Sequence, residues 1–130
     1  KQQVYENLGL DELNNNLPEV VTNSNGTAYK FPNGVMICIK SVVISATGTK
    51  SWGSMYEDTA DRSLGNWAET FTASPFAIAS CEKNSTNGGS WWLEYITGFS
   101  TTSAGSARPC RATSASGTAV VNVVGFGMWK

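Results

Sequence analysis

The sequence predicts a mainly β protein, an antiparallel sandwich or barrel that follows a short N-terminal helix. Ser, Thr, Asn and Gly make up 52 of the 130 residues and concentrate between apolar runs. Those runs either alternate or are rich in β-branched residues, as strands do. No run beyond residue 18 has helical spacing. Short strands joined by Gly/Ser/Asn loops are typical of all-antiparallel folds.

The first 17 residues differ from the rest of the chain. Leu and Val recur there at spacings near three to four, which predicts a helix from Lys1 to about Leu8, ended by Gly9. A second turn is expected at residues 10–14. Such short helices need a neighbouring chain or domain to cover their apolar side. We therefore expect a helical neck or linker over 1–17 and a β domain over 18–130.

The β domain opens with a predicted hairpin. Strands at 27–31 and 35–45 flank Pro-Asn-Gly at 32–34, which is a turn signal. The longer strand, VMICIKSVVIS, is apolar on both faces. We expect a central strand covered on both sides, one face by the chain's own core and the other by a second sheet or a partner chain.

Five more strands are expected, separated by polar segments. The predicted strands are 51–56, 76–83, 91–99, 108–114 and 118–129. The predicted loops and turns are 46–50, 57–65, 84–90, 100–107 and 116–117. The loop at 57–65 is unusual because it holds many charges in a chain that is only 15% charged.

The last predicted strand is apolar on both faces. One face carries small residues, namely Ala119, Val121, Val123, Gly125 and Gly127, and ends in Trp129. A flat, small-residue face suits tight packing between subunits. It equally suits a strand central to a large sheet, and both interpretations stay open here.

Composition excludes several classes of function. The net charge is −1 and there is no His, so Ser-His-Asp and Cys-His catalysis and imidazole metal ligation are excluded. Nucleic-acid binding needs a basic face, which this balance does not supply. No apolar stretch reaches the length of a membrane span. We therefore expect no cofactor, no metal, no nucleic-acid partner and no membrane insertion.

Three cysteines, Cys38, Cys81 and Cys110, form neither a CxxC motif nor a zinc spacing. An odd number does not make a disulfide framework. We expect buried free thiols and synthesis in a reducing cytosol. Because residue 1 is Lys, we also expect this chain to continue a longer protein.

Four segments resemble the C-terminal domains of phage tail fibres. Residues 2–10 (QQVYENLGL) resemble the linker between a fibre shaft and its tip. Residues 25–40 (NGTAYKFPNGVMICIK) resemble the opening hairpin of such a domain. Residues 67–75 (WAETFTASP) resemble an aromatic-x-x-x-Phe-x-x-x-Pro step. Residues 123–130 (VVGFGMWK) resemble the terminal strand, which closes in Gly-x-Trp.

The resemblance implies the receptor-binding tip of a phage or prophage tail fibre. Such tips are generally homotrimeric β-structures that bind bacterial surface glycans or proteins. It implies a virion protein that is assembled in the bacterial cytoplasm and acts outside the cell. The leading helix would then be a three-chain neck, and the last strand would face the threefold axis. The segments 46–65 and 84–117 match no particular member, so receptor identity does not carry over.

Two groups of residues are candidates for ligand binding. Aromatic side chains stack on the apolar faces of sugar rings, while carboxylates and Arg bind hydroxyls. Trp91, Leu93 and Tyr95 form one face of a predicted core stripe, which leaves Trp92 and Glu94 on the other. The charged loop supplies acceptors and one bidentate donor. The candidate residues are Trp52, Tyr56, Asp58, Asp61, Arg62, Trp92 and Glu94.

Catalysis is not expected. A glycan depolymerase needs two carboxylates that face each other across a glycosidic bond, and the acids here suggest no such pair. The predicted function is therefore host recognition. Two alternatives remain, a structural trimerising cap without a ligand and a carbohydrate-binding module of a larger bacterial protein.

Overall fold

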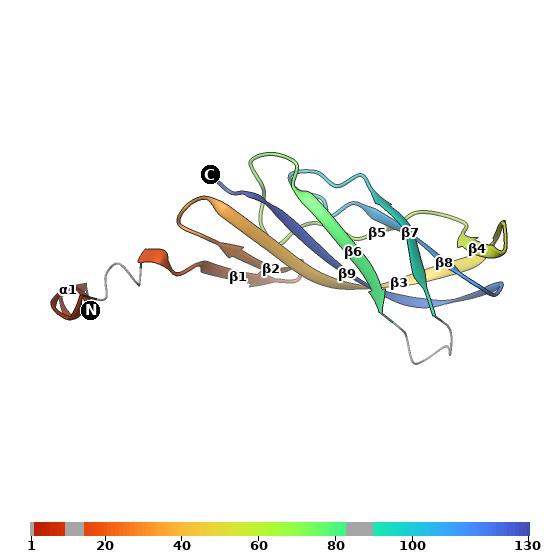
Figure 1. Cartoon of the computed structure of the whole chain (residues 1–130), viewed down its shortest axis with the longest axis horizontal. Helices are drawn as coiled ribbons and strands as arrows, with labels where there is room; N and C mark the ends of the chain where they lie inside the picture. Colours follow the sequence, from red (N-terminus) through yellow and green to blue (C-terminus); the bar gives the residue numbers. More distant parts are fainter. Residues whose placement is uncertain (1, 10–14, 83–89) are drawn as a thin grey trace.

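The computed structural model describes residues 2–9, 15–82 and 90–130. Most of them belong to one antiparallel sheet of nine strands that curls into a half-barrel (Figure 1). The mainly β class is thus confirmed, with one curled sheet in place of two stacked sheets. The elements are α1 (Gln2–Leu8), β1 (Glu19–Asn23), β2 (Gly26–Lys30), β3 (Val35–Trp52), β4 (Met55–Asp58), β5 (Arg62–Ser63), β6 (Phe76–Glu82), β7 (Trp92–Thr97), β8 (Ser106–Arg111) and β9 (Ala115–Met128).

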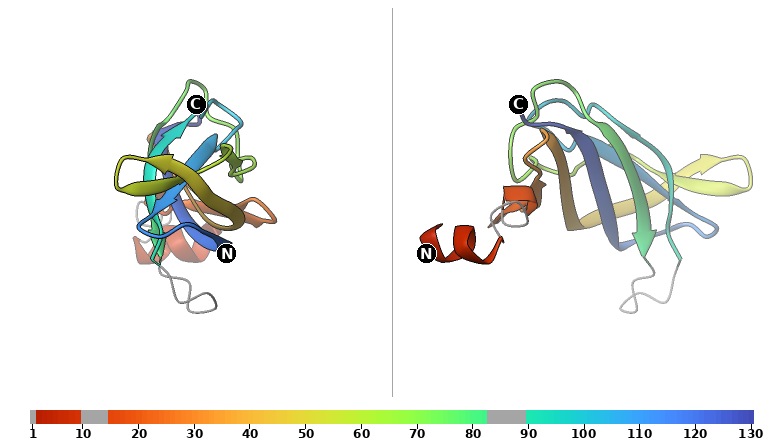
Figure 2. Two further views of the ribbon diagram at one scale, coloured as in Figure 1. Left: turned by 90° about the vertical axis from the view of Figure 1, so that its right-hand side faces the viewer. Right: turned by 60° about the vertical axis from the view of Figure 1, so that its left-hand side comes forward.

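The sheet is organised around two long strands, β3 and β9. Along the curl the strands follow the order β6, β9, β3, β4, β8, β7. The first half of β3 also pairs with β2, and β2 with β1, on the edge that β4 occupies farther along β3. Strands β6 and β7 approach each other, so the two ends of the path come together around the core (Figure 2).

Strand β3 is longer than predicted. The expected polar loop at 46–50 belongs to it, because β9 stays paired with β3 as far as Gly48 opposite Ala115. A complete backbone ladder outweighs the polarity of this stretch. The predicted strand at 51–56 accordingly divides at the turn containing Gly53, into the end of β3 and the start of β4.

The core lies inside the curl and takes alternate residues from each long strand. Val121 and Val123 of β9 are 0% and 1% exposed, within the chain's own core. Trp67 packs over Gly125, where a Cβ would come within 2.9 Å of the indole. The small-residue face of β9 is therefore an internal packing surface, and its prediction as a contact between subunits is wrong.

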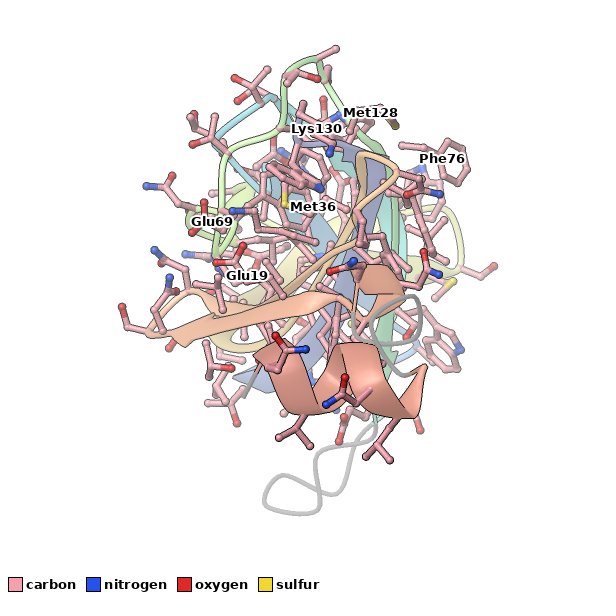
Figure 3. The ribbon with its side chains drawn as sticks, turned by 90° about the vertical axis from the view of Figure 1, so that its left-hand side faces the viewer. Glu19, Met36, Glu69, Phe76, Met128 and Lys130 are labelled. Atoms are coloured by element: carbon pink, nitrogen blue, oxygen red, sulfur yellow. The ribbon has the colours of Figure 1, made fainter. Side chains whose placement is uncertain are left out.

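The opposite face of the same strands is apolar but exposed. Val43 is 68% exposed and Phe76 is 70% exposed. Figure 3 shows Phe76 at the periphery, while Met36 of β3 lies in the interior. Within the described chain nothing covers this outer side of β3, so the two-sided cover expected for the strand is absent from a single copy.

The N-terminal helix forms as predicted, and Gly9 follows it with a φ of 67°. It lies away from the sheet (Figure 1), and its Val4 and Leu8 are exposed. The second turn, predicted at 10–14, lies outside the described residues. The three-chain neck stays a prediction, because a single copy does not test assembly.

Other segments differ from the predictions in detail. Strand β1 was not predicted, because its run Glu-Val-Val-Thr-Asn is short and exposed along most of its length. The turn predicted at 116–117 is part of β9, and the chain reverses at 112–114 instead. Residues 84–89 of the predicted polar loop lie outside the described residues.

The three cysteines are free thiols, as predicted. Cys38 and Cys110 are buried and Cys81 is half-buried. Burial, followed by the influence of Cys110, raises the pKa of Cys81 to about 11. Thiols with pKa values this high react slowly at neutral pH. No helix within the described residues is long and apolar enough to cross a membrane.

Candidate functional site

Two of the predicted ligand-binding residues meet in one pocket. Trp52 ends β3 and Trp92 begins β7, forty positions later, and both line a pocket of about 420 Å³. Their side chains are 48% and 50% exposed. Glu94, also predicted, lies beside them. The full lining is Trp52, Met55, Trp92, Leu93, Glu94, Cys110 and Ala112.

A β-bulge in β3 turns Trp52 outward. Residues at even positions, such as Ile44 and Ala46, point into the core along the first part of the strand. The register with β4 then shifts between Gly48 and Lys50. Because a bulge inserts one residue and reverses the alternation, Trp52 lies on the outer face despite its even number.

A second bulge, in β7, corrects the predicted core stripe. The register with β8 shifts between Leu93 and Tyr95, which leaves Glu94 as the extra residue. Trp91 is buried at 3%, as the stripe requires, and Trp92 is exposed as predicted. Tyr95 is 38% exposed and not in the core, because the bulge turns it outward and brings Ile96 inward in its place.

Glu57 lies in the middle of an ion-pair network beneath the pocket. It faces Cys110 on β8, which in turn faces Trp92, so these side chains form one row across three strands. Lys50 forms an ion pair with Glu57, and Arg108 Nη1 lies 3.7 Å from Glu57 Oε1. Although Glu57 is only 6% exposed, it has two cationic neighbours to compensate its charge.

Glu94 and Glu57 form a carboxyl–carboxylate pair. Lys50 first, and then the Glu94 hydrogen bond, hold the pKa of Glu57 below its ordinary value. Burial and then the same hydrogen bond raise the pKa of Glu94. Among the described residues, Glu94 Oε2 is buried without any hydrogen-bond donor. The two carboxyl groups thus influence each other in opposite directions, lowering the pKa of Glu57 and raising that of Glu94.

Asp61 extends the network along the rim of the site. Tyr95 donates its hydroxyl hydrogen to Asp61 Oδ1 at 2.9 Å, and Arg108 Nε donates to the same oxygen at 2.7 Å. The Arg108 guanidinium also lies 5.6 Å from the centre of the Tyr95 ring. These contacts, Arg108 foremost, lower the pKa of Asp61, so the rim carries a fixed negative charge beside a fixed positive one.

Three predicted residues lie apart from the pocket. Asp58 is 0% exposed and accepts two hydrogen bonds from Arg62, at 2.8 and 2.6 Å, which close the charged loop on itself. Tyr56 neighbours Glu57 in β4 and therefore points to the other face of that strand. It lies opposite Arg111 and Ser51, so the structure does not bring it together with Trp52 as one platform.

Sequence reasoning missed several residues of the site. Met55, Cys110 and Ala112 line the pocket, while Lys50 and Arg108 fix its carboxylates. No local pattern announced them, because their position depends on pairing between β3, β4 and β8. Strand Ser106–Arg111 was predicted, with shifted bounds, but its arginines were not assigned to any surface.

The site is suited to binding through stacking and hydrogen bonding. Two exposed indoles flank an apolar floor, and carboxyl and guanidinium groups lie at its edge. Within the described parts of the chain, no three Cys, Asp or Glu side chains gather as metal ligands. Of the described residues that line the pocket, Glu94 alone carries a carboxyl group, whereas glycosidases use a pair.

No protein-family model, no curated protein and no solved structure matches the chain. The pocket geometry and the sequence resemblance therefore carry the functional proposal.

Proposed function

We propose that this chain is the receptor-binding tip of a phage-type tail fibre and that it binds a bacterial surface glycan. The observation that carries the proposal is the convergence of Trp52 and Trp92 on one pocket. Large aromatic side chains are usually buried, so two half-exposed tryptophans at one pocket favour a site at which a ligand covers them. Indole faces are also the surfaces on which sugar rings stack.

The polar groups around the pocket fit a hydroxylated ligand. Asp61 and Arg108 offer an acceptor and a donor at the rim, at positions fixed by the bonds between them. Fixed polar groups orient a ligand without a large entropic cost. Glu94 places a carboxyl group in the lining of the pocket, with Glu57 as its neighbour, which favours a neutral saccharide over an acidic one.

Binding is a better account of the carboxyl groups than catalysis. Glu57 is neutralised by Lys50 and Arg108, so it is poorly placed as a nucleophile or base. Among the described residues that line the pocket, Glu94 has no second carboxyl group with which to flank a glycosidic bond. We therefore propose an adhesin, with no catalytic residue.

Assembly into a homotrimer belongs to the same proposal. Threefold presentation multiplies weak individual sites into firm attachment to a cell surface. A structural trimerising cap without a ligand is the second candidate, favoured by the exposed apolar face around Val43 and Phe76. A monomeric carbohydrate-binding module is the alternative that a monomer in solution would favour.

The test compares binding by the parent chain and by Trp52→Ala and Trp92→Ala variants. The probes are an array of neutral and acidic bacterial saccharides and whole bacterial cells. Each variant should lose affinity tenfold or more, about 1.4 kcal/mol. Leu17→Ala, which removes an exposed apolar side chain outside the sheet, should bind like the parent. Undiminished binding by both tryptophan variants would remove the pocket from the proposal, and no binding by the parent would favour the structural cap.

A further inference from the structure

The outer face of five neighbouring strands is a largely apolar surface. Direct register pairs carry one row across β1, β2, β3, β9 and β6. Residues paired directly in an antiparallel ladder lie on the same face, so each row is a line of adjacent side chains. The first row is Val20, Tyr29, Ile37, Phe126 and Phe76. The second row is Thr22, Thr27, Ile39, Val124 and Ile78.

Two further rows complete this surface, which we call the outer face. Ser41, Asn122 and Ser80 form a polar row, in which Asn122 donates to Glu82 Oε2 at 2.6 Å. Val43, Val120 and Glu82 follow. Glu82 is thus the single charged residue among these four rows. Depletion of charge is characteristic of the centre of protein interfaces.

The exposed area of the outer face is large enough for a stable interface. Six of its side chains are between 39% and 70% exposed, namely Val20, Ile39, Val43, Phe76, Ile78 and Phe126. Met128, which pairs with Val35 next to the first row and on the same side of the sheet, is 42% exposed and adds to them. Taking about 200 Å² for each residue when free, they present on the order of 700 Å². Each partner in a standard protein interface buries roughly 800 Å². Monomers seldom leave an apolar patch of this size in water.

The outer face also has a projecting side chain and hollows that could receive it. Phe76 projects from its edge at 70% exposure. Two hollows of about 480 and 160 Å³ adjoin its polar row and share Asn122 and Val124. The projecting ring of one copy can enter an apolar-walled hollow of the next copy, which is the head-to-tail contact that a closed trimer requires. The exposed Phe76 ring and the open hollows can thereby cover each other between copies.

We propose that the outer face is the interface between copies of this chain, and that the partner that covers it is a second copy. The proposal rests on the assembly of copies proposed above and names the surface responsible. It replaces the small-residue face of β9, which is consumed by the chain's own core. Trp52 lies nine residues beyond Val43 along β3, and Trp92 belongs to β7, which is not one of the five strands of the outer face (Figure 1). Assembly therefore leaves the pockets open.

The test measures mass by size-exclusion chromatography with light scattering over a range of concentrations. The parent chain should be oligomeric, and Phe76→Asp and Ile78→Asp should shift it to a monomer with an unchanged far-ultraviolet circular dichroism spectrum. Trp92→Asp is the matched control, because it places the same charge on an equally exposed residue outside the outer face. It should remain oligomeric.

Three outcomes would overturn the proposal. A parent chain that is monomeric at every concentration would show that a second copy does not cover the outer face, whatever other protein does. Oligomers that persist in a Phe76→Asp/Ile78→Asp double variant would place the interface elsewhere. Dissociation of the Trp92→Asp control to the same extent would show that charge alone explains the effect. Glycan binding by monomeric Phe76→Asp is read separately, so failure of the interface and failure of the pocket are distinguished.

Discussion

Trp91 and Trp92 are adjacent in the chain but lie on opposite sides of the sheet. Trp91 is 3% exposed and its ring lies 4.8 Å from the guanidinium of Arg111, whereas Trp92 is 50% exposed at the pocket. One strand thus serves the core with one indole and the surface with the next. The pair allows stability and binding to be separated by single substitutions.

Trp91→Ala should lower the free energy of unfolding by about 3–5 kcal/mol, because it opens a large cavity in the core. Trp92→Ala should change it by about 1 kcal/mol or less, because its side chain is half in water already. Urea unfolding followed by circular dichroism measures both. Equal losses in the two variants would contradict the assignment of their faces.

Gly125→Ala should destabilise the chain by about 1–3 kcal/mol through overpacking. A Cβ at this position would lie 2.9 Å from the Trp67 indole, which packs edge-to-face with Phe71 at 5.8 Å and so has little freedom to move. Thermal unfolding provides the measurement. Ser45→Ala on the exposed side of β3 is the control and should leave the melting temperature nearly unchanged, whereas a Gly125→Ala variant as stable as this control would rule out close packing.

Glu94→Gln should make the free energy of unfolding less dependent on pH at pH values above the ordinary pKa of a glutamic acid. A carboxyl whose pKa is raised by folding stabilises the fold below its unfolded pKa, and this contribution is lost as pH rises through the folded value. Gln keeps the hydrogen bond to Glu57 without titrating. The free energy of unfolding of the variant should therefore rise relative to that of the parent between pH 5 and pH 8. Both values lie above the ordinary glutamic acid pKa of about 4.3.

Urea midpoints of the parent and of Glu94→Gln at several pH values measure this effect. Glu94→Leu serves as the control, since it removes the hydrogen bond as well as the charge. A difference between parent and Glu94→Gln that stays constant with pH would show that folding does not raise the pKa of Glu94.

The Asp58–Arg62 pair predicts the opposite pH dependence. Burial alone would raise the pKa of Asp58, but the hydrogen bonds from Arg62 and from backbone groups outweigh it and lower that pKa. A carboxyl with a lowered pKa stabilises the fold above its unfolded value and loses this contribution as pH falls through about 4. Asp58→Asn should therefore flatten the acid limb of the stability profile.

Arg62→Met tests the same pair from the other side. It leaves Asp58 charged and buried, which should cost about 3 kcal/mol at neutral pH. The cost should shrink on acidification, when Asp58 takes up a proton. A cost that does not vary between pH 7 and pH 3, values on either side of about 3.9, would show that Arg62 acts through packing alone.

The sequence predicted strands well where one face was strongly apolar. The alternation of Phe76, Ala77 and Ile78 gave β6 with its correct faces, and Pro-Asn-Gly gave the β2–β3 hairpin. The fate of those faces was harder to foresee. Whether the small or the large side of β9 turns inward depends on Trp67 and Phe71, which come from a distant irregular segment.

The aromatic residues of the candidate site were predicted, but the residues that surround and fix them were missed. Trp52, Trp92 and Glu94 were named from exposure and residue type alone. Their convergence depends on two bulges, and a bulge has no local signature when the inserted residue is an ordinary Glu or Thr. Asp58 and Arg62 were predicted as ligand contacts because the sequence does not distinguish a charged loop residue that contacts a ligand from one that pairs with another residue of the same loop.

The course of strand β3 determines how the domain would bear a pulling force. Its first half borders the outer face and its last residue is Trp52, so one uninterrupted backbone joins the two surfaces. In the proposed assembly, a pull on a ligand bound in the pocket would be resisted by neighbouring copies through β9 and β6 as well as through β3. The β3–β9 ladder from Val35 to Gly48 has its hydrogen bonds perpendicular to that pull, so they bear the load in shear and must break together, not one after another.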